Sequence, residues 1–262
     1  MTLPPVAEPF LLPFHYGALH QVGIDYLVDP EPARAVLAKR HPGLDVAEFD
    51  GRACVSVNFQ LYFAQYQNGG GITQEIEVNL VAVPRGAQDR VSSLTYPDYA
   101  SGVDTSGLLG IGRLHVLCDN DIAIRAGTLL FAEPKYPARF EVSMPSLNGP
   151  ATSTWSVDCL GHFAFTARLD GLPATPVHSA PITGYGTTEE GRLLAGPMNV
   201  YQPCQLYHLD DPDRITLTVT DPSTEVCTDL TTMIGTAPAV AAWTFQSTPV
   251  AAHNRPYYQP FA

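Results

Sequence analysis

Lys135 is the residue whose type and surroundings most clearly favour chemistry. It follows Pro134 and the apolar run Leu129-Leu130-Phe131-Ala132, and the chain has only one other lysine, Lys39. A buried lysine can become a neutral amine, whereas arginine keeps its proton. A neutral amine attacks carbonyl carbon and forms a Schiff base. This pattern predicts a nucleophilic lysine, and a lysine that extends from a strand end to water is the alternative.

The residues around Lys135 form a longer motif. The segment from Cys118 to Phe140 reads C-D-N-D-I-A-I-R-A-G-T-L-L-F-A-E-P-K-Y-P-A-R-F. It resembles the active-site stretch of the acetoacetate decarboxylase family, whose pattern is roughly D-N-E-P-A-I-x-x-G-R-E-x-x-x-x-P-K-K. Aligned without a gap, Asp121 takes the acidic third position, and the identical residues are Asp119, Asn120, Ala123, Ile124, Gly127, Pro134 and Lys135. The resemblance implies decarboxylation of a β-keto acid, with no cofactor beyond a covalent imine on the lysine.

The position after Lys135 departs from the family, which has a second lysine there that assists by repulsion. This chain has Tyr136 instead. We expect Tyr136, Phe131 and Arg125 to contact substrate. Burial is then the expected cause of a lowered Lys135 pKa, with Arg125 or Arg113 as an additional cation.

The family has two carboxylates upstream of the lysine, and this sequence keeps only one of them. At the same separations, one falls on Glu75 and the other on Gln60. The resemblance assigns Glu75 a role in proton transfer or in holding the imine, and leaves Gln60 a hydrogen bond to substrate. A solvent-facing Glu75 is the alternative. The family's amino-terminal arginine has no match, and His20, which lies near its place, is a candidate substrate contact.

A β-hairpin must position the two upstream residues. The segment Val55 to Tyr66 is rich in β-branched and aromatic residues, which favour a strand. Asn68-Gly69-Gly70-Gly71 predicts a tight reversal, after which Ile72 to Pro84 returns as the partner strand. Alternation places Glu75 and Glu77 on the same face of that returning strand.

Three other segments bear on the site. Asp29 is expected to cap a helix through Arg40, because Pro30 and Glu31 suit its first turn. The apolar segment Ile122 to Leu130 is expected to be a strand that leads into the lysine turn. Residues 85–106 are expected to form an inserted loop, in which Tyr96 and Tyr99 pack against the protein rather than close over substrate.

The composition favours a mainly β fold with few short helices. Of 262 residues, 24 are proline and 21 glycine, and only 15% are charged. The resemblance specifies a closed antiparallel β-barrel or cone with flanking strands, associated into a homo-oligomer. No linker interrupts the strands, so residues 1–262 are expected to form a single domain with an amino-terminal arm over residues 1–20. The tail aromatics Tyr257, Tyr258 and Phe261 would suit an oligomer interface.

Bulk properties exclude several classes of partner. The net charge of −12 argues against a nucleic acid or an anionic membrane surface. No apolar run is long enough to span a bilayer, and no secretory signal pattern is expected. The five cysteines lie far apart without a C-x-x-C pair, which predicts reduced thiols and a cytoplasmic location. The eight histidines lack metal-binding spacing, so no metal is expected.

Three functions are compatible with these residues. The first is a Schiff-base lyase that decarboxylates a β-keto acid through Lys135. The second is an aldolase, dehydratase or cyclase that uses the same lysine imine on a 2-oxo acid. The third is a non-catalytic β-barrel that binds a small apolar ligand, with Lys135 as the charge partner of Glu133. In both enzymatic cases the partner is a small keto acid.

Overall fold

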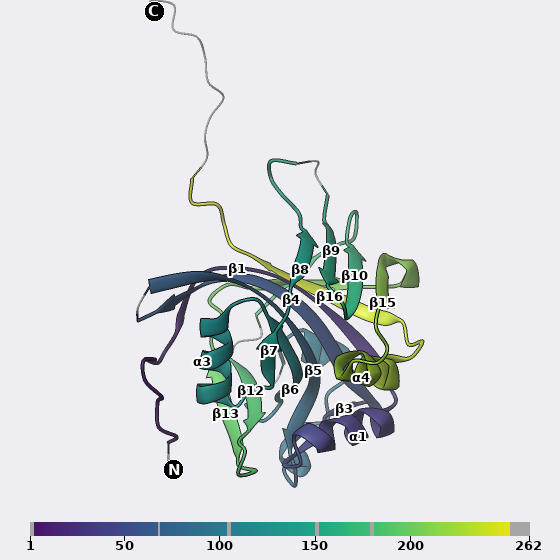
Figure 1. Cartoon of the computed structure of the whole chain (residues 1–262). Helices are drawn as coiled ribbons and strands as arrows, with labels where there is room; N and C mark the ends of the chain where they lie inside the picture. Colours follow the sequence, from purple (N-terminus) through teal and green to yellow (C-terminus); the bar gives the residue numbers. More distant parts are fainter. Residues whose placement is uncertain (1–2, 68, 104–105, 150–151, 179–180, 252–262) are drawn as a thin grey trace, which may run out of the picture.

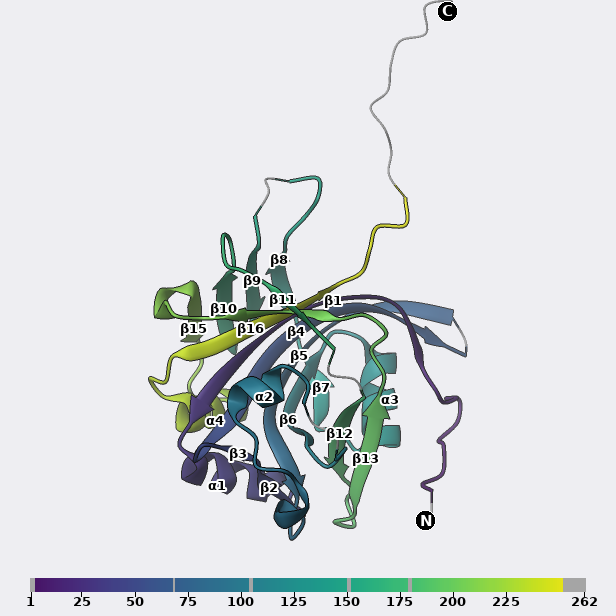
Figure 2. The same ribbon diagram turned by 180° about the vertical axis from the view of Figure 1, so that it is seen from behind.

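The computed structural model of the protein describes residues 3–67, 69–103, 106–149, 152–178 and 181–251. Its main feature is a twelve-stranded sheet whose long central strands curve across the molecule, with a smaller sheet above them (Figures 1 and 2). The path of the large sheet is β11 (Thr175–Val177), β14 (Cys204–His208), β16 (Ala239–Gln246), β1 (His15–Val28), β4 (Arg52–Tyr66), β5 (Gly69–Pro84), β6 (Gly110–Cys118), β12 (Ile182–Thr187) and β13 (Leu193–Met198). Three short strands pair with strands of this path: β2 (Leu44–Val46) with β5, β3 (Glu48–Phe49) with β4, and β7 (Lys135–Pro137) with β6.

One face of the large sheet is apolar and forms the main core. The second sheet, ordered β15 (Ile215–Val219), β10 (Phe163–Arg168), β9 (Thr154–Cys159) and β8 (Phe140–Ser143), shares a single hydrophobic cluster with it. The rings of Phe59 and Trp155 meet there with centroids 6.5 Å apart. Helices α1 (Pro30–Arg40) and α4 (Glu225–Ile234) contribute to the same cluster, and Asp29 caps α1 as expected by accepting a hydrogen bond from the Glu31 amide.

The predicted hairpin is confirmed as β4 and β5, which pair antiparallel over their whole length. Gln60 lies directly opposite Glu75 in this register, and Asn58 lies opposite Glu77. Because side chains alternate along a strand, these four polar residues share the face opposite the apolar core. All except Gln60 are buried, so this part of the second face is polar without being open to solvent.

The mainly β class with few helices is confirmed, but a closed antiparallel barrel is not. Within the described residues the large sheet runs from edge strand β11 to edge strand β13, and these two do not pair. Two of its pairings, β6 with β12 and β6 with β7, are parallel. Strand β1 begins at His15, inside the segment expected to be an arm. The tail aromatics Tyr257, Tyr258 and Phe261 lie outside the described residues.

The segment Ile122 to Leu130, expected to be a strand, is part of helix α3 (Asp121–Phe131). The Asn120 side chain caps this helix by accepting hydrogen bonds from the amides of Ile122 and Ala123. The buried positions Ala123, Ala126, Gly127 and Leu130 have the spacing of one helical face. A short apolar run fits a strand or a buried helix equally well, and here the amino-terminal cap decides.

The expected inserted loop is folded rather than open. It contains the 3₁₀ turn η1 (Gln88–Arg90) and the short helix α2 (Tyr96–Ala100), whose start is stabilised by reciprocal hydrogen bonds between Thr95 and Asp98. Tyr96 is 5% exposed, and its hydroxyl donates a 2.8 Å hydrogen bond to the buried Asp25 carboxylate of β1. The prediction that the Tyr96 ring packs is confirmed. A second 3₁₀ turn, η2 (Pro212–Arg214), precedes β15.

None of the described helices is long and apolar enough to cross a membrane.

Replacing Tyr96 by phenylalanine tests how firmly this segment is held. Burial raises the pKa of Asp25, and hydrogen bonds from Ser56, Tyr96 and Trp243 oppose that rise. Losing one donor should lower the free energy of unfolding by about 1–3 kcal/mol, the cost of leaving a buried acceptor under-satisfied. Urea denaturation measures this change, with Tyr201→Phe as the control because Tyr201 is 89% exposed. Equal stability of the two variants would contradict the anchoring role.

Candidate active site

Lys135 enters the polar face through the turn between α3 and β7. Helix α3 ends at Phe131, and the capping residue Ala132 adopts a left-handed conformation with φ 51°. The Glu133 amide then donates to the Gly127 carbonyl at 3.1 Å, and β7 pairs in parallel with β6 from Lys135 onward. The Lys135 side chain is only 6% exposed. The amine is therefore enclosed by protein.

Glu75 is the direct partner of Lys135. Its Oε2 lies 2.5 Å from the Lys135 Nζ. Tyr62 donates a 2.8 Å hydrogen bond to the same carboxylate oxygen, and Gln60 donates a 2.9 Å hydrogen bond to the other. The structure thus brings together three residues expected from the sequence, Lys135, Glu75 and Gln60, and excludes a solvent-facing Glu75.

A second ion pair adjoins the first. The Arg113 Nε donates a 3.0 Å hydrogen bond to Glu77 Oε1. The Glu77 Oε2 accepts hydrogen bonds from Asn79 at 2.8 Å and from Asn58 at 3.4 Å. Alternation along β5 had indicated that Glu77 would join Glu75, but the Arg113 contact depends on an irregularity in the β5–β6 register between Val78 and Asn79.

Glu133 links the two pairs. One of its oxygens lies 3.6 Å from Arg113 Nη1 and the other lies 3.6 Å from Lys135 Nζ. Gly127 permits this arrangement, because a Cβ there would lie 2.3 Å from Glu133 Oε2 and 2.7 Å from Lys135 Cδ. The cluster therefore holds three carboxylates and two cations on the covered face of the sheet.

The expected low pKa of Lys135 is wrong for this structure. Burial lowers the pKa of Lys135, but the carboxylates of Glu75 and Glu133 outweigh burial and raise the pKa above its ordinary value. Burial raises the pKa of Glu75 despite its lysine partner. Burial would also raise the pKa of Glu77, but Arg113 and Asn79 hold it below the ordinary value. The resting pair is consequently an ammonium next to a carboxylate that accepts protons readily.

Tyr136 does not contact this cluster. It follows Lys135 in β7, so its side chain points to the opposite face, where it packs against the main apolar core. Its hydroxyl lies 3.3 Å from His115 Nδ1, and His115 Nε2 lies 2.9 Å from an Asp229 carboxylate oxygen of α4. The expected substrate contact of Tyr136 is therefore not supported.

The other three candidates also lie elsewhere. His20 and Gln21 are consecutive residues of β1, so their side chains point to opposite faces of the sheet. The Gln21 side chain donates a hydrogen bond to Asn58 on the polar face, and His20 therefore faces the other side. Arg125 is exposed on α3. Phe131 packs with Phe14 of the amino-terminal segment, with ring centroids 6.3 Å apart. Of the two arginines considered from the sequence, Arg113 is the one that reaches the site.

Cys118 is a neighbouring nucleophile that the site does not activate. It lies opposite Glu75 in the pairing of β5 with β6. Burial and the negative charge of Glu75 raise the pKa of its thiol to about 12. A thiol held in this way stays protonated near neutral pH and is a weak nucleophile. Among the described residues, no group of three or more histidine, cysteine or acidic side chains is placed to hold a metal ion.

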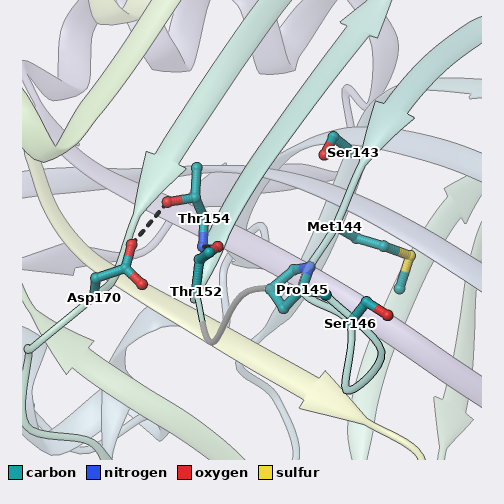
Figure 3. Close-up of a pocket in the computed structure, with 8 residues that line it drawn as sticks. Ser143, Met144, Pro145, Ser146, Thr152, Thr154 and Asp170 are labelled. Atoms are coloured by element: carbon teal, nitrogen blue, oxygen red, sulfur yellow. Dashed lines mark hydrogen bonds between the residues drawn. The ribbon is translucent and has the colours of Figure 1, made fainter.

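Two surface hollows lie away from Lys135. The larger, about 560 Å³, is formed by the β8–β9 connection and the residues around Asp170 (Figure 3). There the Asp170 carboxylate already accepts hydrogen bonds from Thr154 Oγ1 at 2.8 Å and from the Ser153 amide. The second, about 400 Å³, lies between β2, β3 and the segment 88–94. Neither hollow includes the Lys135 cluster in its lining.

Comparison with known proteins identifies the fold. No family model and no curated protein matches this sequence. Among solved structures, the enduracididine biosynthesis enzyme MppR complexed with pyruvate has a TM-score of 0.58 at 16% identity, covering 93% of this chain and 86% of that one. Acetoacetate decarboxylase from Legionella pneumophila subsp. pneumophila str. Philadelphia 1 has a TM-score of 0.51 at 14% identity, covering 96% and 92%. An acetoacetate decarboxylase-like enzyme from Sphingomonas wittichii RW1 has a TM-score of 0.50 at 13% identity, covering 92% and 94%.

The chain therefore has the fold of the acetoacetate decarboxylase-like enzymes, which confirms the resemblance seen around Lys135.

Substituting Arg113 by methionine tests the buried charge balance. The change leaves Glu77 buried without its counter-ion and should lower the free energy of unfolding at pH 7 by about 3–5 kcal/mol. The loss should shrink towards pH 5. The reason is that the unpaired Glu77 would have a folded-state pKa above its unfolded value of about 4.3, so protonation on going from pH 7 to pH 5 relieves the cost of the buried charge. In the wild type the Glu77 pKa is lowered, so its stabilising contribution persists over this range and is lost only at lower pH.

Urea denaturation at both pH values measures the effect. The matched control is Arg125→Met, because Arg125 is exposed on α3. The double variant Arg113→Met/Glu77→Gln should recover most of the lost stability, since no unpaired charge remains. If Arg113→Met were as stable as Arg125→Met, the ion pair between Arg113 and Glu77 would not contribute to the free energy of unfolding as predicted.

Proposed function

We propose that this chain, with the fold of the acetoacetate decarboxylase-like enzymes, is a lyase that forms a Schiff base between Lys135 and a keto acid. The reaction we favour is decarboxylation of a β-keto acid. The observation that supports it most directly is the enclosed Lys135 amine at 2.5 Å from Glu75, a carboxylate that Tyr62 and Gln60 hold in place. The imine needs no metal or organic cofactor.

The first step is transfer of a proton from the Lys135 ammonium to Glu75. The short distance between them makes the transfer direct, and burial raises the proton affinity of Glu75. The neutral amine then adds to the ketone carbon. After addition, the nitrogen gives up one proton to the former ketone oxygen, and Glu75 returns the second. The oxygen then leaves as water and a protonated imine remains. Tyr62 and Gln60 act as positioning residues in this step, because they fix the carboxylate.

The protonated imine is the electron sink. When the bond between the α-carbon and the carboxylate carbon breaks, carbon dioxide leaves and the electron pair forms an enamine with the imine. Protonation of the enamine carbon and addition of water then release the ketone and the free lysine. Glu75, which contributes most to raising the Lys135 pKa, favours positive charge at this nitrogen, so it also stabilises the iminium.

A second reaction through the same imine is supported by one observation. The neighbour with a TM-score of 0.58 is MppR, whose structure contains pyruvate, a 2-oxo acid. A 2-oxo acid bound as an imine loses a proton to give an enamine that adds to an aldehyde, as in aldolases. Dehydration or cyclisation would follow the same imine.

We also propose that the protein is cytoplasmic and forms a homo-oligomer, with the whole chain as a single domain. All five cysteines are buried and unpaired, which supports a reducing compartment.

Reductive trapping tests the proposed nucleophile. Incubation with acetoacetate or pyruvate and borohydride should leave a mass adduct on Lys135 in the wild-type protein. The adduct should be lost in Lys135→Ala, because no amine remains to form the imine, and retained in Lys39→Ala. Absence of an adduct with every keto acid and ketone tried would favour the non-catalytic binding protein instead.

The branch of the reaction is decided by product analysis. Release of carbon dioxide from acetoacetate, without condensation of pyruvate with aldehydes, is the expected outcome. Condensation without carbon dioxide release would assign the aldolase branch and contradict the decarboxylase.

Replacing Glu75 by glutamine tests proton transfer. The amide cannot accept the ammonium proton, so turnover should fall by roughly two to four powers of ten. Gln60→Glu restores a carboxylate near the lysine from the neighbouring strand, and partial recovery in Glu75→Gln/Gln60→Glu would support that reason. A turnover unchanged by Glu75→Gln would contradict the assigned role.

A further inference from the structure

Glu133 differs from the other two carboxylates of the site in how it is held. Glu75 accepts hydrogen bonds from Tyr62 and Gln60, and Glu77 accepts them from Arg113 and two asparagines. Within the described part of the chain, the Glu133 carboxylate accepts no hydrogen bond. Its nearest cations lie 3.6 Å away. Glu133 is therefore held by charge alone.

The position of Glu133 is that of a carboxylate bridging two cations. Its Oε1 faces Arg113 and its Oε2 faces Lys135. Arg113 uses its Nε for Glu77 and directs Nη1 to this side. A keto acid whose ketone reaches the Lys135 amine has its own carboxylate within a few bonds of that nitrogen. The two anions therefore compete for one place.

The numbers of acidic and basic side chains in the cluster explain why the two carboxylates compete. Glu75, Glu77 and Glu133 oppose only Lys135 and Arg113, so the enclosed cluster already carries one negative charge in excess. A fourth carboxylate in a largely desolvated site would be strongly unfavourable. One carboxylate must therefore leave the cluster when substrate binds. Glu133 costs the least free energy to move, because it accepts no hydrogen bond from the described residues.

Glu133 is placed where it can move. It lies in the short link between the end of α3 at Phe131 and the start of β7 at Lys135, after the left-handed Ala132. Its side chain is 10% exposed, against 3% for Glu75. Rotation of this side chain towards solvent would uncover both cations without disturbing the Glu75 pair.

We propose that Glu133 occupies the site of the substrate carboxylate in the unliganded protein, and that a short-chain keto acid displaces it to bind between Lys135 and Arg113. This inference rests on the proposed function for the class of ligand. It assigns Arg113 as the residue that binds the substrate carboxylate and Glu133 as an internal competitor that sets the affinity for anionic substrates.

Calorimetric binding of 3-hydroxybutyrate tests this inference, because this alcohol lacks the ketone and cannot form an imine. Glu133→Gln removes the competing charge and should tighten its binding about tenfold or more, equivalent to about 1.4 kcal/mol. Binding of 1,3-butanediol, which has no carboxylate, should change less than about twofold, well below that step. Glu141→Gln is the control, because Glu141 is exposed on β8 and its loss changes the net charge equally.

The outcomes separate this inference from the proposed function. Unchanged or weaker binding of 3-hydroxybutyrate to Glu133→Gln, or no binding to either protein, would overturn the carboxylate site. That result would leave a borohydride adduct on Lys135 unaffected. Tighter binding together with no adduct would refute the imine and retain the carboxylate site. If Glu133→Gln unfolds, Glu133→Met, which is uncharged and of similar size, replaces it in the same comparison.

Discussion

The buried contact between Lys135 and Glu75 is the interaction on which the site depends. Either group alone would be driven to its neutral form by burial, the lysine by losing its proton and the glutamate by gaining one. Together they remain charged, because the 2.5 Å contact and the hydrogen bonds to Glu75 offset the lost hydration. The protein meets this requirement by placing both partners on regular strands, where the register fixes their separation.

The large sheet makes such a contact possible because one of its faces packs into the hydrophobic core while the opposite face carries buried polar side chains. The apolar face packs against the second sheet, α1 and α4 and supplies the main hydrophobic core. The opposite face carries a continuous network in which Gln21 donates to Asn58, Asn58 donates to Glu77, and Glu77 pairs with Arg113. A polar network is tolerated in an interior when its members have partners. The rigid hairpin of β4 and β5 supplies most of these partners.

The sequence predicted the part of the site that lies on this hairpin. Its glycine-rich turn predicted the hairpin, and period-two alternation placed Glu75 and Glu77 on one face, because strand geometry is local. Gln60 came from the spacing of the family that the sequence resembles. The apolar run before Lys135 was ambiguous between strand and helix, and only the Asn120 cap distinguishes them. Tyr136 was misplaced because consecutive residues of a strand face opposite sides, so it cannot share the Lys135 face. Arg125 was misplaced because its segment is a helix and Arg125 lies on the exposed side of that helix. The contact of Arg113 depends on a strand irregularity that no local pattern marks.

Because of these carboxylates, the proposed Schiff-base reaction would need a different route to a neutral amine. In acetoacetate decarboxylase, a second cation or loss of hydration activates the lysine by lowering its pKa. Here the residue after Lys135 is a tyrosine that faces the opposite side of the sheet, and Arg113 is neutralised by Glu77 and Glu133. Neighbouring anions raise the pKa of the lysine instead, so a nearby base must remove the proton. Glu75 is in contact with the amine and has a raised pKa. In the proposed mechanism, an iminium at the same nitrogen restores the positive charge that Glu75 favours. The carboxylate that opposes formation of the neutral amine would then stabilise the intermediate that follows it.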